Sequence, residues 1–441
     1  MPGESIYNLF ESVFIASGQK KALTFFKDGK IETVLTYESL LKDINQFAAF
    51  LLKYSLKKGD RVILLLEKSI INIVAYLALL KGGVIVVPLN PGFKRNELEY
   101  LVKDADAKLI LVDFKKKQMI RAMDSKIKIL EIQMQLPYKD LDFFKSVPVS
   151  TVETQIELKD PALIIYTSGT TGNPKGAVLS HGNLICDAKN IISTWKISNK
   201  DVVCHSLPLF HIHGLCFALH TALLSSAHVI MPDRFSPKTV LERLISKQTA
   251  ETCTVFMAVP AMYTKIMDFI GKQSFDFSHM RLFTSGSAPL LEKEFLRIKQ
   301  IFGKEPVERE GMSETGMNFS NPLKENKIPG SIGIPLPGVQ VRIVDPDSER
   351  DKTPGKVGEI WLKSPAVTKG YWQKPKETKK TFNHGWFRTG DLGKIDNNGY
   401  YYLTDRIKHL VITGGENVSA KEVETVINQI KGVKESSVVG V

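Results

Sequence analysis

The 441-residue sequence predicts an α/β protein. We expect a large N-terminal domain of doubly wound sheets, a small β-barrel-like subdomain and a small α+β C-terminal domain. Three observations lead to this fold class. Before Pro335, apolar strands alternate with helices. After it, strands that mix polar and apolar residues are separated by turns. A polar stretch at 404–409 precedes the last elements. The length exceeds what one hydrophobic core normally fills, so subdomains are expected.

The alternation starts at 61–66, an arginine followed by five apolar residues, which is typical of a buried strand. An apolar helix is expected at 70–80, where Gly82 and Gly83 end it. Further strands are expected at 84–88, 108–113, 162–166, 176–179, 202–205, 228–231, 254–257 and 281–285, and further helices at 98–105, from 182, at 214–224 and at 237–246. Ser180 is the expected N-cap of the helix near 182. Strands that are apolar throughout need cover on both faces, which predicts a parallel sheet between helices.

The strands expected after Pro335 alternate between polar and apolar residues, and turns such as 397–399 separate them. This pattern is typical of an antiparallel or barrel-like unit. The strands are expected at 339–344, 358–362 and 400–403, and beyond the polar linker we expect a strand at 410–412, a helix at 421–429 and a strand at 436–439. The predicted domains are therefore 1–403 and 410–441, joined by the linker 404–409.

The net charge of +12 indicates a positive surface potential. Nucleic acid, an acidic membrane surface and anionic small molecules all attract such a charge. The lysines form no stripe interleaved with aromatic residues, so nucleic acid is disfavoured and a phosphate or carboxylate substrate is favoured. The four cysteines show no CxxC spacing, which argues against a disulfide framework and a zinc site.

The N-terminal residues 1–21 contain no apolar core of a signal peptide and are poor in arginine for a transit peptide. The most apolar stretch, 69–88, is interrupted by Lys81 and two glycines, so no membrane span is expected. We expect a cytoplasmic protein, or a protein of the mitochondrial matrix if the source is eukaryotic. We expect a monomer or a homodimer.

The segment most informative about chemistry is 166–176, Tyr-Thr-Ser-Gly-Thr-Thr-Gly-Asn-Pro-Lys-Gly, which lies between two expected strands. Its glycines permit a tight loop whose amides and hydroxyls can donate to phosphate oxygens, and Lys175 adds a positive charge. The alternative is a solvated surface loop, which rarely combines these residues between buried strands. No Gly-Lys-Ser/Thr opens a helix here, so the loop is not a Walker A motif.

This segment resembles the signature loop of the adenylate-forming superfamily, which includes acyl-CoA synthetases, peptide-synthetase adenylation domains and firefly luciferase. Further segments resemble motifs of this family in the same order, at 285–289, 311–315, 389–391, 405–408 and 414–417. The resemblance implies an AMP-binding domain, a hinge at 404–409 and an acid–thiol ligase that uses ATP, Mg²⁺ and CoA. The residues it implies for ATP are Thr167, Ser168, Gly169, Thr170, Thr171, Gly172, Lys175, Gly286, Ser287, Ala288, Glu310, Gly311, Met312, Ser313, Asp391 and Arg406.

Each of these implied roles has a physical reason. Glu314 would give Mg²⁺ a hard oxygen ligand, and Ser313 can donate to the α-phosphate. Asp391 can accept from the ribose hydroxyls, and Arg406 supplies a fork of donors nearby. Taken singly, either acid is more often a solvated surface residue, but the order and spacing of the motifs favour binding roles. The predicted catalytic residues are Thr167, Lys175, His211 and Glu314.

Two histidines, His211 and His213, form a close pair after Pro208. A metal site is one interpretation, but the pair lacks a clear third ligand and follows an expected strand-to-helix turn. The resemblance gives His211 the place of the aromatic gate between the carboxylate and the CoA channel. His213 would then lie behind it.

Arg309 precedes the 311–315 segment, at a position that in many relatives is small and borders the acyl pocket. A buried charge opposes an aliphatic or aryl tail and favours a second carboxylate, held by about 2–4 kcal/mol. Malonyl-CoA synthetases resemble the chain here and in Asn321-Pro322, and they carry a second cation that Lys265 is expected to match. The predicted acid is malonate or methylmalonate. The alternatives are an outward Arg309 paired with Glu308 and a solvated Lys265.

The sequence departs from the family pattern in two places. Glu310 stands where an aromatic residue usually stacks on adenine, and the loss of stacking is expected to cost about 1–3 kcal/mol. The chain ends at Val441, whereas relatives continue to a lysine that contacts the carboxylate and the α-phosphate. We therefore expect a truncated form that binds ATP and acid but adenylates poorly. The remaining alternatives are a ligase for another aliphatic or aryl acid and a catalytically impaired nucleotide- or acyl-binding homologue.

Overall fold

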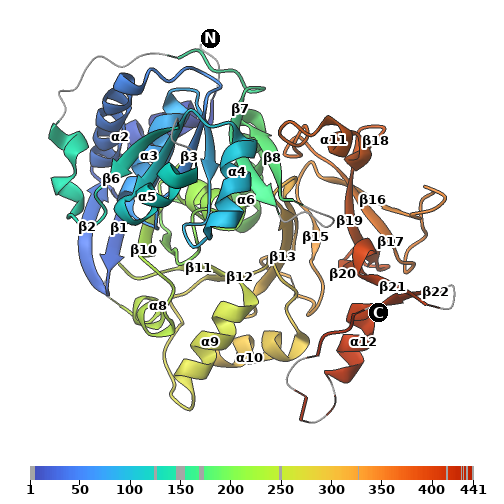
Figure 1. Cartoon of the computed structure of the whole chain (residues 1–441). Helices are drawn as coiled ribbons and strands as arrows, with labels where there is room; N and C mark the ends of the chain where they lie inside the picture. Colours follow the sequence, from blue (N-terminus) through green and yellow to red (C-terminus); the bar gives the residue numbers. More distant parts are fainter. Residues whose placement is uncertain are drawn as a thin grey trace.

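The computed structural model describes residues 5–123, 127–145, 154–167, 173–247, 251–325, 327–413, 416–428, 430, 432–433 and 436–439. Its strands form two large sheets, one antiparallel sheet and a two-stranded ribbon. Figure 1 shows the large sheets in the blue to yellow part of the chain and the antiparallel sheet beside them in orange and red. The predicted α/β class is confirmed.

The first large sheet has the strand order β6-β5-β3-β4-β7-β8. Its strands are β3 (Arg61–Leu65), β4 (Ile85–Pro88), β5 (Leu109–Asp113), β6 (Lys128–Ile132), β7 (Pro161–Thr167) and β8 (Lys175–Ser180). Neighbouring strands from β6 to β7 are parallel, and β8 pairs with β7 in the antiparallel direction. The predicted parallel sheet is confirmed and has an antiparallel edge.

The second large sheet has the order β15-β14-β13-β12-β11-β9-β10-β1-β2. Its strands are β1 (Lys21–Lys27), β2 (Lys30–Thr36), β9 (Val202–Cys204), β10 (His228–Pro232), β11 (Val255–Ala258), β12 (Leu282–Ser285), β13 (Val307–Met312), β14 (Gly316–Ser320) and β15 (Ile334–Pro335). The central strands are parallel, and both edges are antiparallel. The parallel strands β12 and β13 therefore end at the same edge of the sheet.

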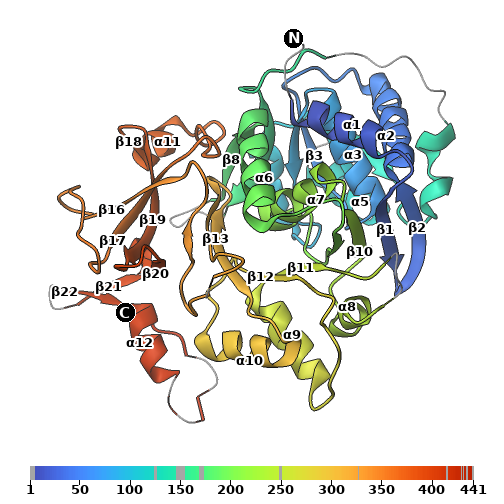
Figure 2. The same cartoon turned by 180° about the vertical axis from the view of Figure 1, so that it is seen from behind.

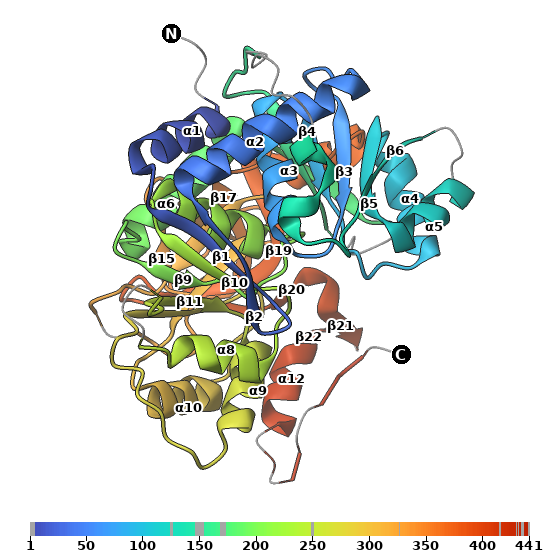
Figure 3. The same cartoon turned by 90° about the vertical axis from the view of Figure 1, so that its left-hand side faces the viewer.

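Helices cover both faces of the first sheet. Alternate residues of β3 belong to different apolar clusters, since Val62 and Leu64 pack with α3 (Ile70–Lys81) and Ile63 and Leu65 pack with α4 (Arg95–Ala105). Figure 3 shows α3 and α4 on opposite sides of these strands. The other helices of the two large sheets are α1 (Ile6–Ser17), α2 (Tyr37–Leu51), α5 (Phe114–Met123), α6 (His181–Trp195), η4 (His213–His220), α7 (Thr221–Leu224), α8 (Pro237–Leu244), α9 (Pro260–Ile270) and α10 (Glu292–Phe302).

Two local predictions about these helices have different outcomes. Ser180 caps α6 as predicted, and its side chain accepts from the amide of Asn183. The helix predicted at 214–224 begins as a π-helix over His213–His220. Gly214 in this segment has no room for a side chain, because a Cβ there would lie 2.0 Å from the carbonyl oxygen of Pro208. π-Helical segments are frequent at functional sites.

The antiparallel sheet lies beside the large sheets, as Figure 2 shows from behind. It consists of β16 (Gln340–Val344), β17 (Gly358–Lys363), β18 (Phe382–Asn383), β19 (Trp386–Ile395) and β20 (Tyr401–Arg406), with α11 (Pro375–Thr381) beside β18. The predicted turn between β19 and β20 is confirmed, since Asp396 Oδ1 accepts from the amides of Asn398 and Tyr400 at 2.9 Å. A small apolar cluster that includes Ile343 and Ile360 forms the core of this sheet.

The C-terminal part contains η5 (Ile407–His409), β21 (Leu410–Thr413), β22 (Glu416–Ser419) and α12 (Ala420–Ile427). The strand predicted at 436–439 is wrong, because these residues form no strand. No described strand pairs with them, and the amide of Val438 instead donates to Glu424 Oε1 at 2.9 Å. With no described strand beside it, the segment bonds to α12 instead, where Ser436 Oγ also donates to the carbonyl oxygen of Glu424 at 3.4 Å.

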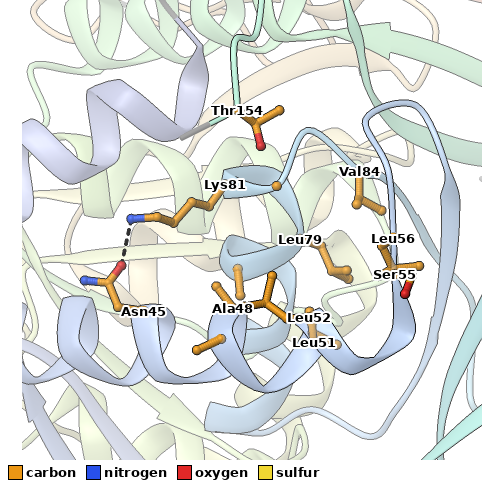
Figure 4. Close-up of a pocket in the computed structure, with 13 residues that line it drawn as sticks. Asn45, Ala48, Leu51, Leu52, Ser55, Leu56, Leu79, Lys81, Val84 and Thr154 are labelled. Atoms are coloured by element: carbon orange, nitrogen blue, oxygen red, sulfur yellow. Dashed lines mark hydrogen bonds between the residues drawn. The ribbon is translucent and has the colours of Figure 1, made fainter. Parts of the chain in front are cut away.

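A cavity of about 150 Å³ opens between α2 and α3, and apolar side chains such as Leu52 and Leu79 line it (Figure 4). At its polar end Lys81 Nζ donates to Asn45 Oδ1 at 2.7 Å and to Glu11 Oε1 at 2.9 Å. None of the predicted site residues lines this cavity. In the part of the chain that the structure describes, no helix is long and apolar enough to cross a membrane.

Candidate active site

The predicted phosphate loop connects β7 to β8. Its two ends lie side by side, because Thr167 is paired with Lys175 in the antiparallel register. Gly176 has no room for a side chain, since a Cβ would lie 2.6 Å from Cγ2 of Ile164. Outside the described residues lie the predicted ligands Ser168, Gly169, Thr170, Thr171 and Gly172. The structure thus describes the base of the loop.

Glu314 lies in the turn between β13 and β14 and is only 6% exposed. Its Oε1 atom accepts hydrogen bonds from Thr167 Oγ1 at 3.2 Å and from Tyr371 Oη at 3.1 Å. These contacts join the first sheet, the second sheet and the segment between β17 and α11. Burial raises the pKa of Glu314, and the two hydroxyl donors act in the opposite direction.

The donor set around Glu314 fits Mg²⁺ held largely by a substrate. A carboxylate beside a phosphate loop is a hard oxygen ligand of the kind Mg²⁺ prefers. Among the described residues, no group of three or more His, Cys, Asp or Glu residues could hold a metal by itself. Mg²⁺ commonly takes one or two carboxylates and completes its shell with substrate phosphates and water.

The predicted ribose-binding pair is brought together by the antiparallel sheet. Asp391 on β19 lies opposite Arg406 on β20, and Arg406 Nε is 2.6 Å from Asp391 Oδ1. Glu310 on β13 is half-buried and accepts from Asn318 Nδ2 at 3.0 Å. Burial, and then the negative charge of Asp391, raise the pKa of Glu310 to about 7. Three of the predicted nucleotide residues therefore form one electrostatically coupled group.

The remaining predicted nucleotide residues lie at the ends of β12 and β13. Gly286 is buried, whereas Ser287 and Ala288 are exposed. Gly311 cannot carry a side chain, since a Cβ would lie 2.7 Å from the carbonyl oxygen of Gly316. Two further predicted residues, Met312 and Ser313, are half-buried. The carboxyl ends of neighbouring parallel strands are where ligands bind in open α/β sheets.

Arg309 is the most unusual residue of the site. It is 2% exposed, and its guanidinium lies 5.1 Å from the centre of the Phe217 ring. Nη2 donates to Ser287 Oγ at 3.3 Å, but Nε and Nη1 have no hydrogen-bond partner among the described residues. Burial lowers its pKa to about 10. The inward side chain excludes the alternative of a surface arginine.

Gly286 and Ser287 shape the pocket around this guanidinium. A Cβ at Gly286 would lie 2.6 Å from Arg309 Nε, so the position has no room for a side chain. Ser287 has a φ of 66°, in the left-handed region that non-glycine residues rarely adopt. This conformation places its Oγ 3.3 Å from His213 Nδ1 as well as 3.3 Å from Arg309 Nη2. The serine hydroxyl thus links both side chains.

Arg309 forms no described hydrogen bond with the other two predicted substrate residues, His211 and Lys265. His211 is exposed, and its ring centre lies 4.6 Å from that of Phe210. His213 is buried, and burial lowers its pKa well below the usual value. Lys265 is exposed on α9. The metal interpretation of the histidine pair gains no support from the described residues.

Sequence reasoning did not single out two residues of the site. Tyr371 contacts Glu314, and the aromatic pair of Tyr371 and Trp372 after Gly370 was the available signal. Asp187 on α6 is buried and accepts from the amide of Met317 at 2.8 Å. Burial raises its pKa to about 7. No local pattern distinguishes Asp187 from a surface acid on an amphipathic helix.

A family model described as AMP-binding enzyme matches residues 14–372. The chain belongs to this family. It is 34% identical over 418 residues to the mitochondrial malonate–CoA ligase of Bos taurus, with 87% of the chain and 70% of the relative covered. Its structure is similar to ATP-bound MatB from Rhodopseudomonas palustris, with a TM-score of 0.90 and 36% identity over 99% of this chain and 86% of that one.

A third similar structure is the O-succinylbenzoate–CoA synthetase of Bacillus subtilis in complex with ATP and a magnesium ion. Its TM-score is 0.86 at 26% identity, and 98% of this chain and 86% of that chain are covered. The predicted superfamily is therefore confirmed. This AMP-binding enzyme is an acid–CoA ligase, and its substrates and cofactors are a carboxylic acid, ATP, CoA and Mg²⁺.

Proposed function

We propose that this AMP-binding enzyme activates malonate or methylmalonate. The observation that carries the proposal is the buried guanidinium of Arg309, whose nitrogens Nε and Nη1 have no described hydrogen-bond partner. Glu310 and Asp187 act electrostatically on Arg309, but its buried donors remain unpaired among the described residues. Leaving buried donors unpaired is costly, so an anionic ligand that accepts from them would complete the site. A dicarboxylic acid fits because one carboxylate reacts while the other binds Arg309. The names of the bovine relative and its mammalian counterparts support this choice.

The proposed reaction has two steps. A carboxylate oxygen attacks the α-phosphorus of ATP, forming the acyl-adenylate and releasing pyrophosphate. The thiol of CoA then attacks the acyl carbon, forming the thioester and releasing AMP and a proton. When bound, Mg²⁺ neutralises charge on the phosphates. Glu314 would hold the cation, Lys175 and Thr167 would bind phosphate oxygens, and Asp391 with Arg406 would bind the ribose.

The proposed gate is His211, and the proposed second cation is Lys265. His211 is exposed beside Phe210, as a movable gate between two channels would be. Lys265 lies on α9, which begins at Pro260 directly after Val259. Both are proposed to act on bound substrate. We also propose a cytoplasmic location, or the mitochondrial matrix if the source is eukaryotic. We propose a monomer or a homodimer, and light scattering would distinguish these two states.

A panel of acids tests the proposed substrate. Pyrophosphate release would be measured with malonate, methylmalonate, butyrate, benzoate and oxalate at equal concentration. We expect malonate or methylmalonate to give the highest kcat/KM. A higher value for butyrate or benzoate would instead favour a ligase for aliphatic or aryl acids.

Replacing Glu310 by tyrosine is expected to strengthen ATP binding. The aromatic ring would stack on adenine, and the change removes a carboxylate beside Asp391. By analogy with base stacking, the gain is about 1–3 kcal/mol, or roughly 5- to 150-fold in Kd. Isothermal titration calorimetry measures it, with Glu310→Gln as the control that removes only the charge. Equal or weaker affinity of Glu310→Tyr would contradict the expectation.

ATP binding is also expected to depend on pH near neutrality. Because the pKa of Glu310 is about 7, its side chain is mostly neutral below that pH and mostly anionic above it. The anion repels the triphosphate, so ATP affinity should fall roughly two- to tenfold as pH rises from about 6 to about 8. In Glu310→Gln this dependence should disappear. A wild-type affinity that is constant over the range would refute the role of Glu310.

A further inference from the structure

Tyr371 connects the metal-binding carboxylate to the base of the phosphate loop. Its hydroxyl donates to Glu314 Oε1 at 3.1 Å. Its ring lies beneath Lys175, whose Nζ is 5.4 Å from the ring centre. One side chain thus contacts the two groups of opposite charge that flank the predicted phosphate site. A cation above an aromatic face is attracted to the ring.

The backbone around Tyr371 is fixed on both sides. Tyr371 forms an isolated antiparallel bridge with Ala177, two residues after Lys175. The amide of Trp372 donates to the carbonyl of Gly176 at 2.8 Å, and the amide of Val178 donates to the carbonyl of Gly370 at 3.1 Å. The segment therefore extends the first sheet at its β8 edge, so Tyr371 keeps a fixed position relative to Lys175.

A second network holds the same segment from the other side. Asp104, at the end of α4, accepts from Tyr166 Oη at 2.8 Å and pairs with Lys374 Nζ at 2.7 Å. Tyr166 directly precedes Thr167, the other hydroxyl donor to Glu314. The two donors to Glu314 are therefore held in register with each other through Asp104 and through β8.

We propose that Tyr371 is a positioning residue that orients the Glu314 carboxylate for the metal–ATP complex and holds Lys175 with its ring. This proposal rests on the proposed role of Glu314 in holding Mg²⁺. Oε1 receives hydroxyl donors from Tyr371 and Thr167, which fix the plane of the carboxylate. Preorganised ligands bind a metal more tightly because less motion is lost on binding.

Two substitutions separate the functions of the hydroxyl and the ring. In Tyr371→Phe the ring beneath Lys175 remains and only the hydrogen bond to Glu314 is lost, whereas Tyr371→Leu removes both. Tyr402→Phe is the matched control, because Tyr402 Oη donates to Asp396 Oδ2 at 3.0 Å in the β19–β20 hairpin. It removes another tyrosine–carboxylate hydrogen bond, away from the site residues.

The measurements are Mn²⁺ binding to the enzyme–ATP complex by electron paramagnetic resonance and ATP binding without metal by calorimetry. In Tyr371→Phe, Mn²⁺ binding should weaken about tenfold, because a hydrogen bond to a charged group is lost, while metal-free ATP binding stays within about twofold. Tyr371→Leu should weaken metal-free ATP binding as well. Tyr402→Phe should behave like the wild type in both assays.

Two results would overturn the proposal. One is unchanged Mn²⁺ affinity in Tyr371→Phe, and the other is an equal loss of metal-free ATP binding in that variant, which would indicate general distortion of the site. Pyrophosphate release by the wild type with malonate and with butyrate is measured in parallel. Release with butyrate but not with malonate would contradict the proposed substrate, whereas the Mn²⁺ result concerns Tyr371 alone.

Discussion

Arg309→Gly is expected to lower kcat/KM for malonate by roughly 30- to 1,000-fold and to leave that for butyrate nearly unchanged or higher. The reason is the loss of charge-assisted hydrogen bonds worth about 2–4 kcal/mol between the buried guanidinium and the second carboxylate. Butyrate has no such carboxylate, and its apolar tail no longer meets a buried charge. Pyrophosphate release with both acids measures the effect.

Two controls make the Arg309 result specific. Arg309→Lys keeps a positive charge but not the planar fork of donors, so malonate activity should be intermediate. A thermal melt checks folding, because glycine leaves a cavity against Phe217 and Gly286. Malonate turnover that is unaffected in a folded Arg309→Gly variant would show that the acid binds elsewhere.

Glu314→Gln is expected to lower the rate of pyrophosphate release by roughly 100- to 1,000-fold, the range seen when one preorganised electrostatic group is removed from an active site. Glutamine has nearly the same shape, and its amide oxygen can still accept from Thr167 and Tyr371. The substitution therefore removes the charge and leaves the packing intact. The rate should be measured as a function of Mg²⁺ concentration.

The Glu314 variant should also need more Mg²⁺ for half-maximal rate. Glu424→Gln, a substitution in the C-terminal part near α12, serves as the control, because Glu424 accepts from Val438 and contacts none of the site residues. If the Glu314→Gln enzyme releases pyrophosphate within about threefold of the wild-type rate, the residue does not hold the cation.

The sequence predicts the strands β3, β4, β5, β7 and β8 of the first sheet and β9 to β12 of the second, because their patterns are local. No prediction covered β1, β2, β6 and β13 to β15. Runs such as 61–66 and the cap at Ser180 depend on neighbouring residues, and the structure has them within a residue or two. The strand at 436–439 failed because strand formation needs a partner, which no local pattern reveals. The π-helical geometry of His213–His220 was not predicted, because no local pattern distinguishes it from an α-helix.

In the site too, local motifs could be predicted from the sequence, whereas contacts between distant residues could not. The resemblance of the motifs predicts Glu314 and Lys175 near the phosphates and Asp391 near the ribose. The contact between Asp391 and Arg406 comes from the structure. The burial of Arg309 was predicted only through the family resemblance, since its contacts come from Gly286 and Phe217 in distant parts of the chain. Tyr371 was missed for the same reason.

The ion pair between Asp391 and Arg406 limits which residues can act as the hinge of the C-terminal part. Arg406 is the last residue of β20, so its guanidinium moves with the antiparallel sheet that carries Asp391. Rotation about a residue before Arg406 would break this ion pair, in which Arg406 Nε lies 2.6 Å from Asp391 Oδ1, in every catalytic cycle. Residues 404–406 of the implied hinge 404–409 belong to β20, so we propose that the C-terminal part rotates about Ile407–His409. Asp391 and Arg406 can then stay bound to the ribose while the C-terminal part rotates. The nucleotide need not be released between the two half-reactions.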